Sequence, residues 1–180
     1  MASPQCGEIT TPGSSHTISE KSQLDQITGS LIALPKPMAD QLDRLAIHTI
    51  TTKPWSTEQC ISKYAAAGVS AITFWRYNFE DCNPATVGRQ ARDAGLDVAS
   101  VARGGFFPAE SPRLRQEAIE ENLRAIDEAA AVGAPSLVLV CGAHPGQSLQ
   151  DSRVQIRDGI GAIINHATQA GVILAVEPLH

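Results

Sequence analysis

Short apolar runs alternate with longer amphipathic stretches from Arg44 onward. Five of the runs are short, partly β-branched and apolar at nearly every position. That pattern is typical of strands in a parallel sheet that is covered on both faces. The runs are Leu45–Ile50, Val69–Trp75, Leu96–Ala102, Ser136–Cys141 and Val172–Val176. The alternation therefore predicts a parallel sheet whose strands are connected by helices.

The stretches between the runs carry signals for the start and the end of helices. Ser56 and Gln59 have the spacing of a capping box, and Asn83-Pro84 and Ser111-Pro112 each place a capping side chain directly before a proline. Each of four stretches then ends in a glycine just before the next apolar run, where glycine accepts the left-handed backbone that ends a helix. These glycines are Gly68, Gly95, Gly133 and Gly171. The recurrence predicts a repeated βα unit.

Residues 1–40 differ from this pattern, because they are rich in Ser, Thr, Pro and Gln and have no sustained hydrophobic period. We expect a flexible leader there and one globular unit over residues 41–180. The net charge of −5 argues against a nucleic-acid partner. No apolar run approaches the roughly 18 residues of a membrane span, and the start of the chain lacks the features of a secretory signal. We therefore expect a cytoplasmic protein with no membrane partner.

Two α/β architectures remain open, a (β/α) barrel and a small open sheet. The sequence contains neither the GxGxxG motif of a dinucleotide-binding fold nor the GxxxxGK[ST] motif of a P-loop. A complete TIM-type barrel needs about 250 residues. Five predicted strands occupy residues 44–177, so the expectation is a TIM-type barrel that is truncated after about five βα strands.

Candidate site residues gather at the carboxyl ends of these strands, where ligands bind in both architectures. The first predicted strand ends near His48 and the second ends at Trp75, and Arg103 and Glu177 directly follow the third and fifth. His180 comes three residues after Glu177. His48 either contacts substrate or sits satisfied in the barrel mouth, and Trp75 either packs on a sugar ring or covers the core. Arg103 either grips a carboxylate, phosphate or hydroxyl group or bridges two loops.

Glu177 is the most informative of these residues, because it follows the apolar run Val172–Val176, which is expected to be buried. A carboxylate at such a position is costly unless it is paired, protonated or bound to a metal ion. Two interpretations stay open on position alone: a ligand for a hard divalent cation, and a structural ion pair with Arg103.

The segments in order resemble the sugar phosphate isomerase/epimerase family, the xylose isomerase-like barrels. The similarity is carried by Ile47–Thr52, Trp55-Ser56, Ala67–Val69 with Phe74–Arg76, Ser100–Pro108, Ala125–Ala130, Leu137–Gly142 and Ala175–His180. It covers residues 45–180 and is specific to the family but not to one substrate.

The resemblance implies a (β/α)8 barrel that isomerises or epimerises a sugar, a sugar phosphate or a related polyol or ketose through an enediolate. It implies a divalent cofactor, manganese, cobalt, magnesium or zinc, and makes Glu177 the first of four metal ligands and a candidate acid–base. We expect substrate contacts from His180, Arg103, His48 and Trp75. The other three family ligands have no counterpart here, so we expect the 180-residue chain alone to lack isomerase activity and to bind metal weakly.

Two further alternatives share these residues. A dehydratase of the inosose type would use the same fold and the same proton abstraction beside a carbonyl. A non-catalytic chain would instead be a stand-alone fragment or a subunit that completes its barrel with a partner chain. The partners expected are a small-molecule carbohydrate and either further copies of this chain or such a barrel-completing chain. An abasic-site endonuclease of this fold would need a basic surface and more histidines on the early strands, which this acidic chain lacks.

Overall fold

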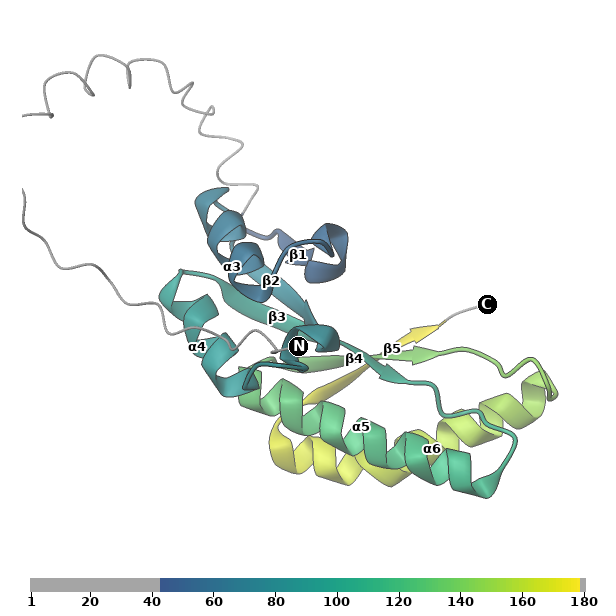
Figure 1. Ribbon diagram of the computed structural model, residues 1–180. Helices are drawn as coiled ribbons and strands as arrows, with labels where there is room; N and C mark the ends of the chain where they lie inside the picture. Colours follow the sequence, from purple (N-terminus) through teal and green to yellow (C-terminus); the bar gives the residue numbers. More distant parts are fainter. Residues whose placement is uncertain (1–42, 179–180) are drawn as a thin grey trace, which may run out of the picture.

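A computed structural model describes residues 43–178 of the chain. Five parallel strands form one sheet and follow one another in chain order: β1 (Ala46–His48), β2 (Ala71–Trp75), β3 (Asp97–Gly105), β4 (Ser136–Cys141) and β5 (Ile173–Pro178). The connecting helices are α3 (Thr57–Ala66), α4 (Pro84–Asp93), α5 (Pro112–Val132) and α6 (Leu149–Ala170) (Figure 1). Short 3-10 helices, η1 (Thr49–Thr52) and η2 (Arg76–Phe79), follow β1 and β2.

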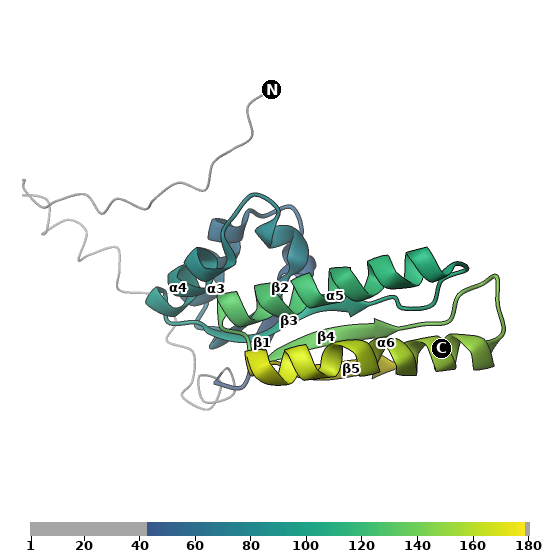
Figure 2. The ribbon, with the colours of Figure 1, turned by 90° about the horizontal axis from the view of Figure 1, so that it is seen from below.

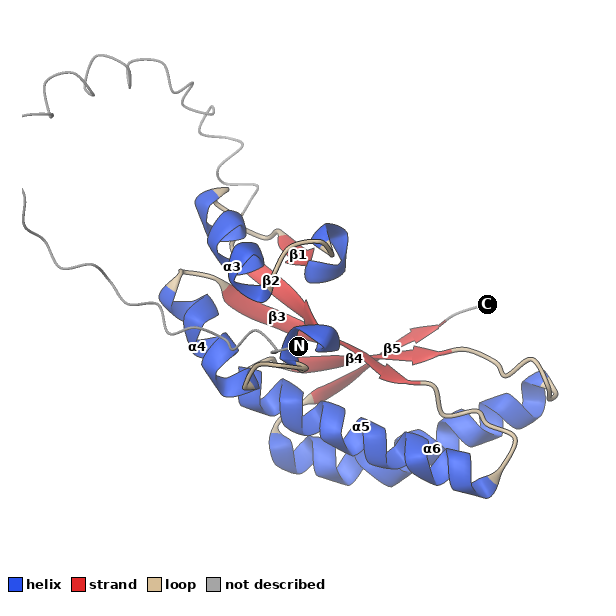
Figure 3. Ribbon diagram, viewed as in Figure 1, coloured by secondary structure: helices blue, strands red, loops and turns tan. Residues whose placement is uncertain are grey.

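The strand order decides between the two predicted architectures. A doubly wound sheet reverses its strand order at a switch point, whereas a barrel adds each strand beside the preceding one. Here the order runs from β1 to β5 without a reversal, and helices and strands alternate throughout (Figure 3). The expected TIM-type architecture is confirmed. The predicted leader, residues 1–40, and His180 lie outside the described residues.

The predicted capping signals produce the helix ends. Ser56 Oγ accepts a hydrogen bond from the Gln59 backbone N–H, and the Gln59 side chain accepts one from the Ser56 N–H, which completes the capping box of α3. The Asn83 and Ser111 side chains cap α4 and α5 by accepting hydrogen bonds from backbone N–H groups of the first turn, each directly ahead of a proline. The four glycines after the helices all have positive φ, between 71° and 83°. Local sequence thus fixes where each helix begins and ends.

The four α-helices of residues 43–178 all lie along one side of the sheet (Figures 1 and 2). Ile72, Phe74, Val101, Leu137 and Leu139 are fully buried in the core between this side and the helices. The opposite side, which we call the inner face, carries no helix of residues 43–178. The sequence-based expectation that both faces are covered is therefore wrong for this part of the chain. An inner face that is free of helices is the geometry of a barrel wall.

Strand β5 departs furthest from its expected burial. Ile173 is 66% exposed and Val176 is 51% exposed, and Glu177 is exposed as well. The run was expected to be buried because it is apolar, but β5 pairs only with β4 among the described strands and forms an edge. The argument that burial makes the Glu177 carboxylate costly is consequently wrong. Its place at the end of a strand is unaffected.

No helix within residues 43–178 is long and apolar enough to cross a membrane. The expected cytoplasmic location stays a prediction.

Candidate functional site

The inner face brings together residues that are far apart in the sequence. In a parallel pair, residues in register point to the same side of the sheet. His48 is in register with Thr73, two residues before Trp75, and Trp75 is in register with Ala102. Thr73 also hydrogen-bonds Ser100 through its hydroxyl, at 2.9 Å. The inner face therefore becomes polar and aromatic toward the carboxyl ends of β1 to β3.

The end of β3 contains a bulge, and this bulge exposes the Arg103 side chain. The register between β3 and β4 shifts between Ala102 and Gly104, so Arg103 is an extra residue in its strand. Gly105 has a φ of 98°, and its backbone lies so close to Val140 that a Cβ there would overlap the Val140 backbone. Only glycine fits this position. The bulge leaves Arg103 exposed between buried neighbours.

Asn122 of α5 fixes this strand end from the helix side. Its Oδ1 accepts a hydrogen bond of 2.7 Å from the Gly105 N–H, and its Nδ2 donates to the oxygens of Gly105 and Ala118, both at 2.8 Å. Asn122 is only 2% exposed. Sequence reasoning missed this residue because an asparagine in the middle of a long helix carries no motif.

Aromatic rings surround the Arg103 guanidinium. Its central carbon lies 5.3 Å from the centre of the Trp75 ring and 4.7 Å from that of Phe106, which are cation–π distances. Trp75 Nε1 in turn donates a 3.4 Å hydrogen bond to His48 Nδ1. His48, Trp75 and Arg103 thus form one connected group across β1, β2 and β3.

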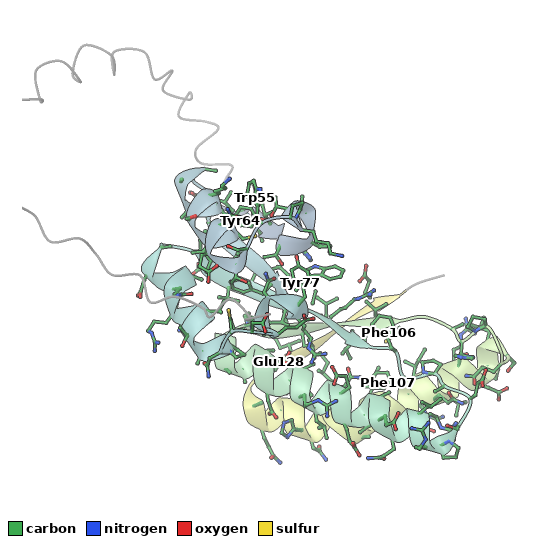
Figure 4. All side chains as sticks on the ribbon, in the orientation of Figure 1. Trp55, Tyr64, Tyr77, Phe106, Phe107 and Glu128 are labelled. Carbon is green, nitrogen blue, oxygen red and sulfur yellow. The ribbon has the colours of Figure 1, made fainter. Side chains whose placement is uncertain are left out.

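A pocket of about 430 Å³ opens beside this group. Its wall includes Trp75 and Arg103, Lys53 after η1, and Arg76 and Glu121. Phe106 completes the wall from the end of β3. Phe107, by contrast, is 2% exposed and packs against Gly159 of α6, so it belongs to the core and not to the site (Figure 4).

Arg76 is held by two glutamates of α5. Its Nε and Nη2 lie 2.5 and 3.0 Å from the two carboxylate oxygens of Glu128, and its Nη1 lies 2.7 Å from Glu121 Oε1. Burial alone would lower the pKa of Arg76, but the hydrogen bonds and charges of the two glutamates outweigh it and raise that pKa above its usual value. Arg76 therefore stays charged, and its charge is balanced by the carboxylates of Glu128 and Glu121.

Glu177 lies on another part of the same face. It is in register with Val140, which is in register with Gly105, so the three form one row across β5, β4 and β3. Two strand spacings, about 10 Å, separate Glu177 from Gly105. Among residues 43–178, neither Glu177 nor Arg103 takes part in an ion pair. The structural ion pair that competed with a functional role for both residues is thus absent from this part of the chain.

The structure consequently joins three of the five candidate residues and sets one apart. His48, Trp75 and Arg103 form a single group, whereas Glu177 lies along the inner face from them. His180 is outside the described residues. Glu121 and Asn122 were not predicted; both come from the middle of α5, away from the strand ends where chemistry was sought.

Comparison with known families gives a match over residues 61–180 to the model described as xylose isomerase-like TIM barrel. The chain belongs to this family. A comparison with curated proteins gave no match. The family match agrees with the chain-order parallel sheet and with a site at the carboxyl ends of its strands.

Solved structures of several other proteins share this fold. A protein from Sinorhizobium meliloti 1021 is 37% identical over 77% of the chain, with a TM-score of 0.72. A D-psicose 3-epimerase in the presence of D-fructose and an L-ribulose 3-epimerase are 16% and 19% identical over 75% and 76% of the chain, with TM-scores of 0.62 and 0.64. The chain spans about half the length of these structures: 52%, 52% and 50%, respectively.

Proposed function

We propose that this protein acts in the isomerisation or epimerisation of a sugar, sugar phosphate or related ketose, by proton transfer beside a carbonyl. The single observation that carries the proposal is the position of Glu177. Its exposed carboxylate lies at the carboxyl end of β5 on the inner face, in register through Val140 with Gly105 at the end of β3, the strand that carries Arg103. The structural neighbours, among them D-psicose and L-ribulose 3-epimerases, favour a ketose as the substrate class.

The chemistry of Glu177 follows from its exposure. The carboxylate removes a proton from the carbon next to a ketose carbonyl, and the electron pair of that C–H bond moves toward the carbonyl oxygen to give an enediolate. Because Glu177 is exposed, the proton that it holds exchanges with water before it returns to the carbon. Return on the same face regenerates the starting sugar with a solvent hydrogen. Formation of the epimer needs a second acid on the opposite face.

A divalent cation, manganese, cobalt, magnesium or zinc, is the proposed cofactor, with Glu177 as one ligand. Among residues 43–178 no three His, Cys, Asp or Glu side chains lie close enough together to hold a metal ion. The described side chains therefore do not fit a complete metal centre. Glu177 alone carries the proposed proton transfer in this part of the chain, and we expect the 180-residue chain to bind metal weakly.

Hydrogen exchange with solvent tests the proposal. The 180-residue chain is incubated in D2O with D-fructose or D-psicose, with and without MnCl2, and mass spectrometry follows deuterium uptake and loss of water. We expect deuterium beside the carbonyl with little or no epimer. Because general base catalysis contributes about 10²-fold or more, Glu177→Gln should reduce this uptake at least tenfold.

Glu80→Gln serves as the matched control, because it removes an exposed carboxylate of the η2 end without touching the inner face. It should exchange deuterium at the wild-type rate. Equal uptake by wild type and Glu177→Gln would contradict the proposal. A product lighter by one water would favour the dehydratase alternative, and exchange that MnCl2 accelerates would support the metal cofactor.

A further inference from the structure

The charges in the wall of the pocket beside His48, Trp75 and Arg103 do not cancel one another. Arg76 is balanced by Glu128 and Glu121, and Glu121 also pairs with Arg124. Two cations of the pocket wall, Lys53 and Arg103, remain. Neither makes a hydrogen bond or ion pair to another residue of the described range 43–178. Two unpaired positive charges in one pocket contrast with the net charge of −5 of the whole chain.

Arg103 is placed so that its hydrogen-bond donors remain available. Its guanidinium carbon lies over the Trp75 ring and over the Phe106 ring, contacts that are made through the π-face and use none of its N–H groups. The guanidinium fork matches the geometry of carboxylate and phosphate oxygens. The aromatic contacts restrict the side chain and leave its donors free for a ligand.

The position of Arg103 is built into the fold. The β3 bulge makes it exposed between buried residues, and the Asn122 hydrogen bonds fix the strand end beside it. Phe106, whose φ of 58° is unusual for a residue with a side chain, is turned outward and is 50% exposed. Strained backbone of this kind is concentrated at ligand sites.

From this arrangement we propose that the pocket binds an oxyanion group of the substrate, a carboxylate or a phosphate, through Arg103 and Lys53. The inference deepens the proposed function and rests on it for the sugar scaffold, because it names the charge class of the substrate. Glu177 lies about two strand spacings from Gly105 along the same row. The anionic group therefore lies at the opposite end of the substrate from the carbon that reacts.

Calorimetric titration of the full 180-residue chain tests the proposal with three probes: D-fructose 6-phosphate, D-glucuronate and neutral D-fructose. We expect at least one anionic probe to bind about tenfold or more tightly than D-fructose, since hydrogen bonds between charged partners are the strong ones. Added NaCl should weaken the binding of the anionic probe and leave that of D-fructose unchanged. The better of the two anionic probes distinguishes a phosphate from a carboxylate.

Arg103→Gln should remove most of the preference for the anionic probe over D-fructose. Arg103→Lys should keep part of that preference, because the charge stays but the planar fork of guanidinium donors is lost. Lys53→Gln should reduce the preference by a few-fold. Arg153→Gln is the control, because it removes an exposed cation of α6 that has no partner among the described residues. It should bind the anionic probe within twofold of wild type. All three changed residues are exposed, and circular dichroism checks that each variant folds.

Equal binding of D-fructose and both anionic probes would overturn the proposal, as would equal losses in Arg103→Gln and Arg153→Gln. The two proposals fail separately. Anion binding that depends on Arg103, together with deuterium exchange that does not depend on Glu177, would support the oxyanion site and contradict the isomerase. Exchange that depends on Glu177 without any anion preference would do the reverse.

Discussion

The ion pairs of Glu121 make the stability of the pocket wall depend on pH. Burial would raise the pKa of its carboxyl, but the hydrogen bonds from Arg76 and Arg124 outweigh burial and hold that pKa below its usual 4.5. A carboxyl whose pKa is depressed in the folded state stabilises the fold at pH values above its unfolded pKa. That contribution is lost as the pH falls through the folded pKa. Acid therefore weakens the wall of the pocket through Glu121.

Glu121→Gln should make the stability of the chain less sensitive to acid. At pH 7 we expect the free energy of unfolding of the variant to be about 0.5 kcal/mol lower than that of wild type. The difference is small because the Glu121 side chain is 47% exposed. The difference should stay constant down to about pH 4.5 and shrink below it. Urea denaturation at several pH values measures it. Glu120→Gln, an exposed neighbour with no arginine partner among the described residues, should show no such convergence.

Some site residues could be predicted from the sequence, and others could not. Trp75 ends one predicted strand and Arg103 directly follows another, so the rule that ligands bind at strand ends was enough to find them. Glu121 and Asn122 reach the site from the middle of α5, and their role depends on how α5 packs on β3. Helix packing is a tertiary fact that local spacing does not contain.

Helix α6 contains two glycines with opposite surroundings. Gly159 is buried, and a Cβ there would overlap the Phe107 ring, whereas a Cβ at Gly161 would meet nothing beyond the local backbone of α6 within 4 Å. Both lie inside one helix, so replacement by alanine brings the same gain in helix propensity, about 1 kcal/mol. The difference in stability between the two alanine variants therefore measures how α6 packs against Phe107, which follows β3.

Gly161→Ala should therefore stabilise the chain by up to about 1 kcal/mol. Gly159→Ala should destabilise it by up to about 2 kcal/mol, because the cost of overpacking, about 1–3 kcal/mol, is only partly offset by the propensity gain of about 1 kcal/mol. Thermal or urea unfolding of both variants measures the contrast. If Gly159→Ala were as stable as Gly161→Ala, the close contact between α6 and Phe107 would be wrong.

Helix ends were more predictable than strand ends. Ser56, Asn83 and Ser111 cap their helices as their spacing predicts, because a cap is a local hydrogen bond. β3 was expected to end at Ala102 but continues to Gly105, since pairing with β4 resumes beyond the bulge. A bulge depends on the neighbouring strand, and a single sequence segment does not reveal it.

The strands and helices of residues 43–178 occur in the predicted βα order, but the burial of the edge strand β5 could not be predicted from its apolar composition. The core between the helices and the sheet was predicted by the apolar runs of β2, β3 and β4. The run of β5 is equally apolar, and yet Ile173 and Val176 are exposed, because burial depends on which strand or helix lies beside it. A partner chain or second copy that covers β5 stays a prediction.

Exposed apolar residues on an edge strand predict that β5 is a site of association between chains. Val176 is 51% exposed, and no strand within residues 43–178 pairs with the far side of β5. Such edges template strand pairing between chains, and a lysine on the strand opposes it by placing charge where another chain would pack. Val176→Lys should shift the 180-residue chain toward monomer in concentrated solution. Sedimentation velocity over a series of protein concentrations measures this.

The control separates the edge from a general effect of charge. Ile164→Lys changes a 42% exposed residue of α6 and adds the same single positive charge, from −5 to −4, without touching β5. It should associate as wild type does, because the β5 edge is intact. Two results would count against an associating edge: a wild-type chain that stays monomeric at every concentration, or an equal shift in both lysine variants. The latter would assign the effect to net charge.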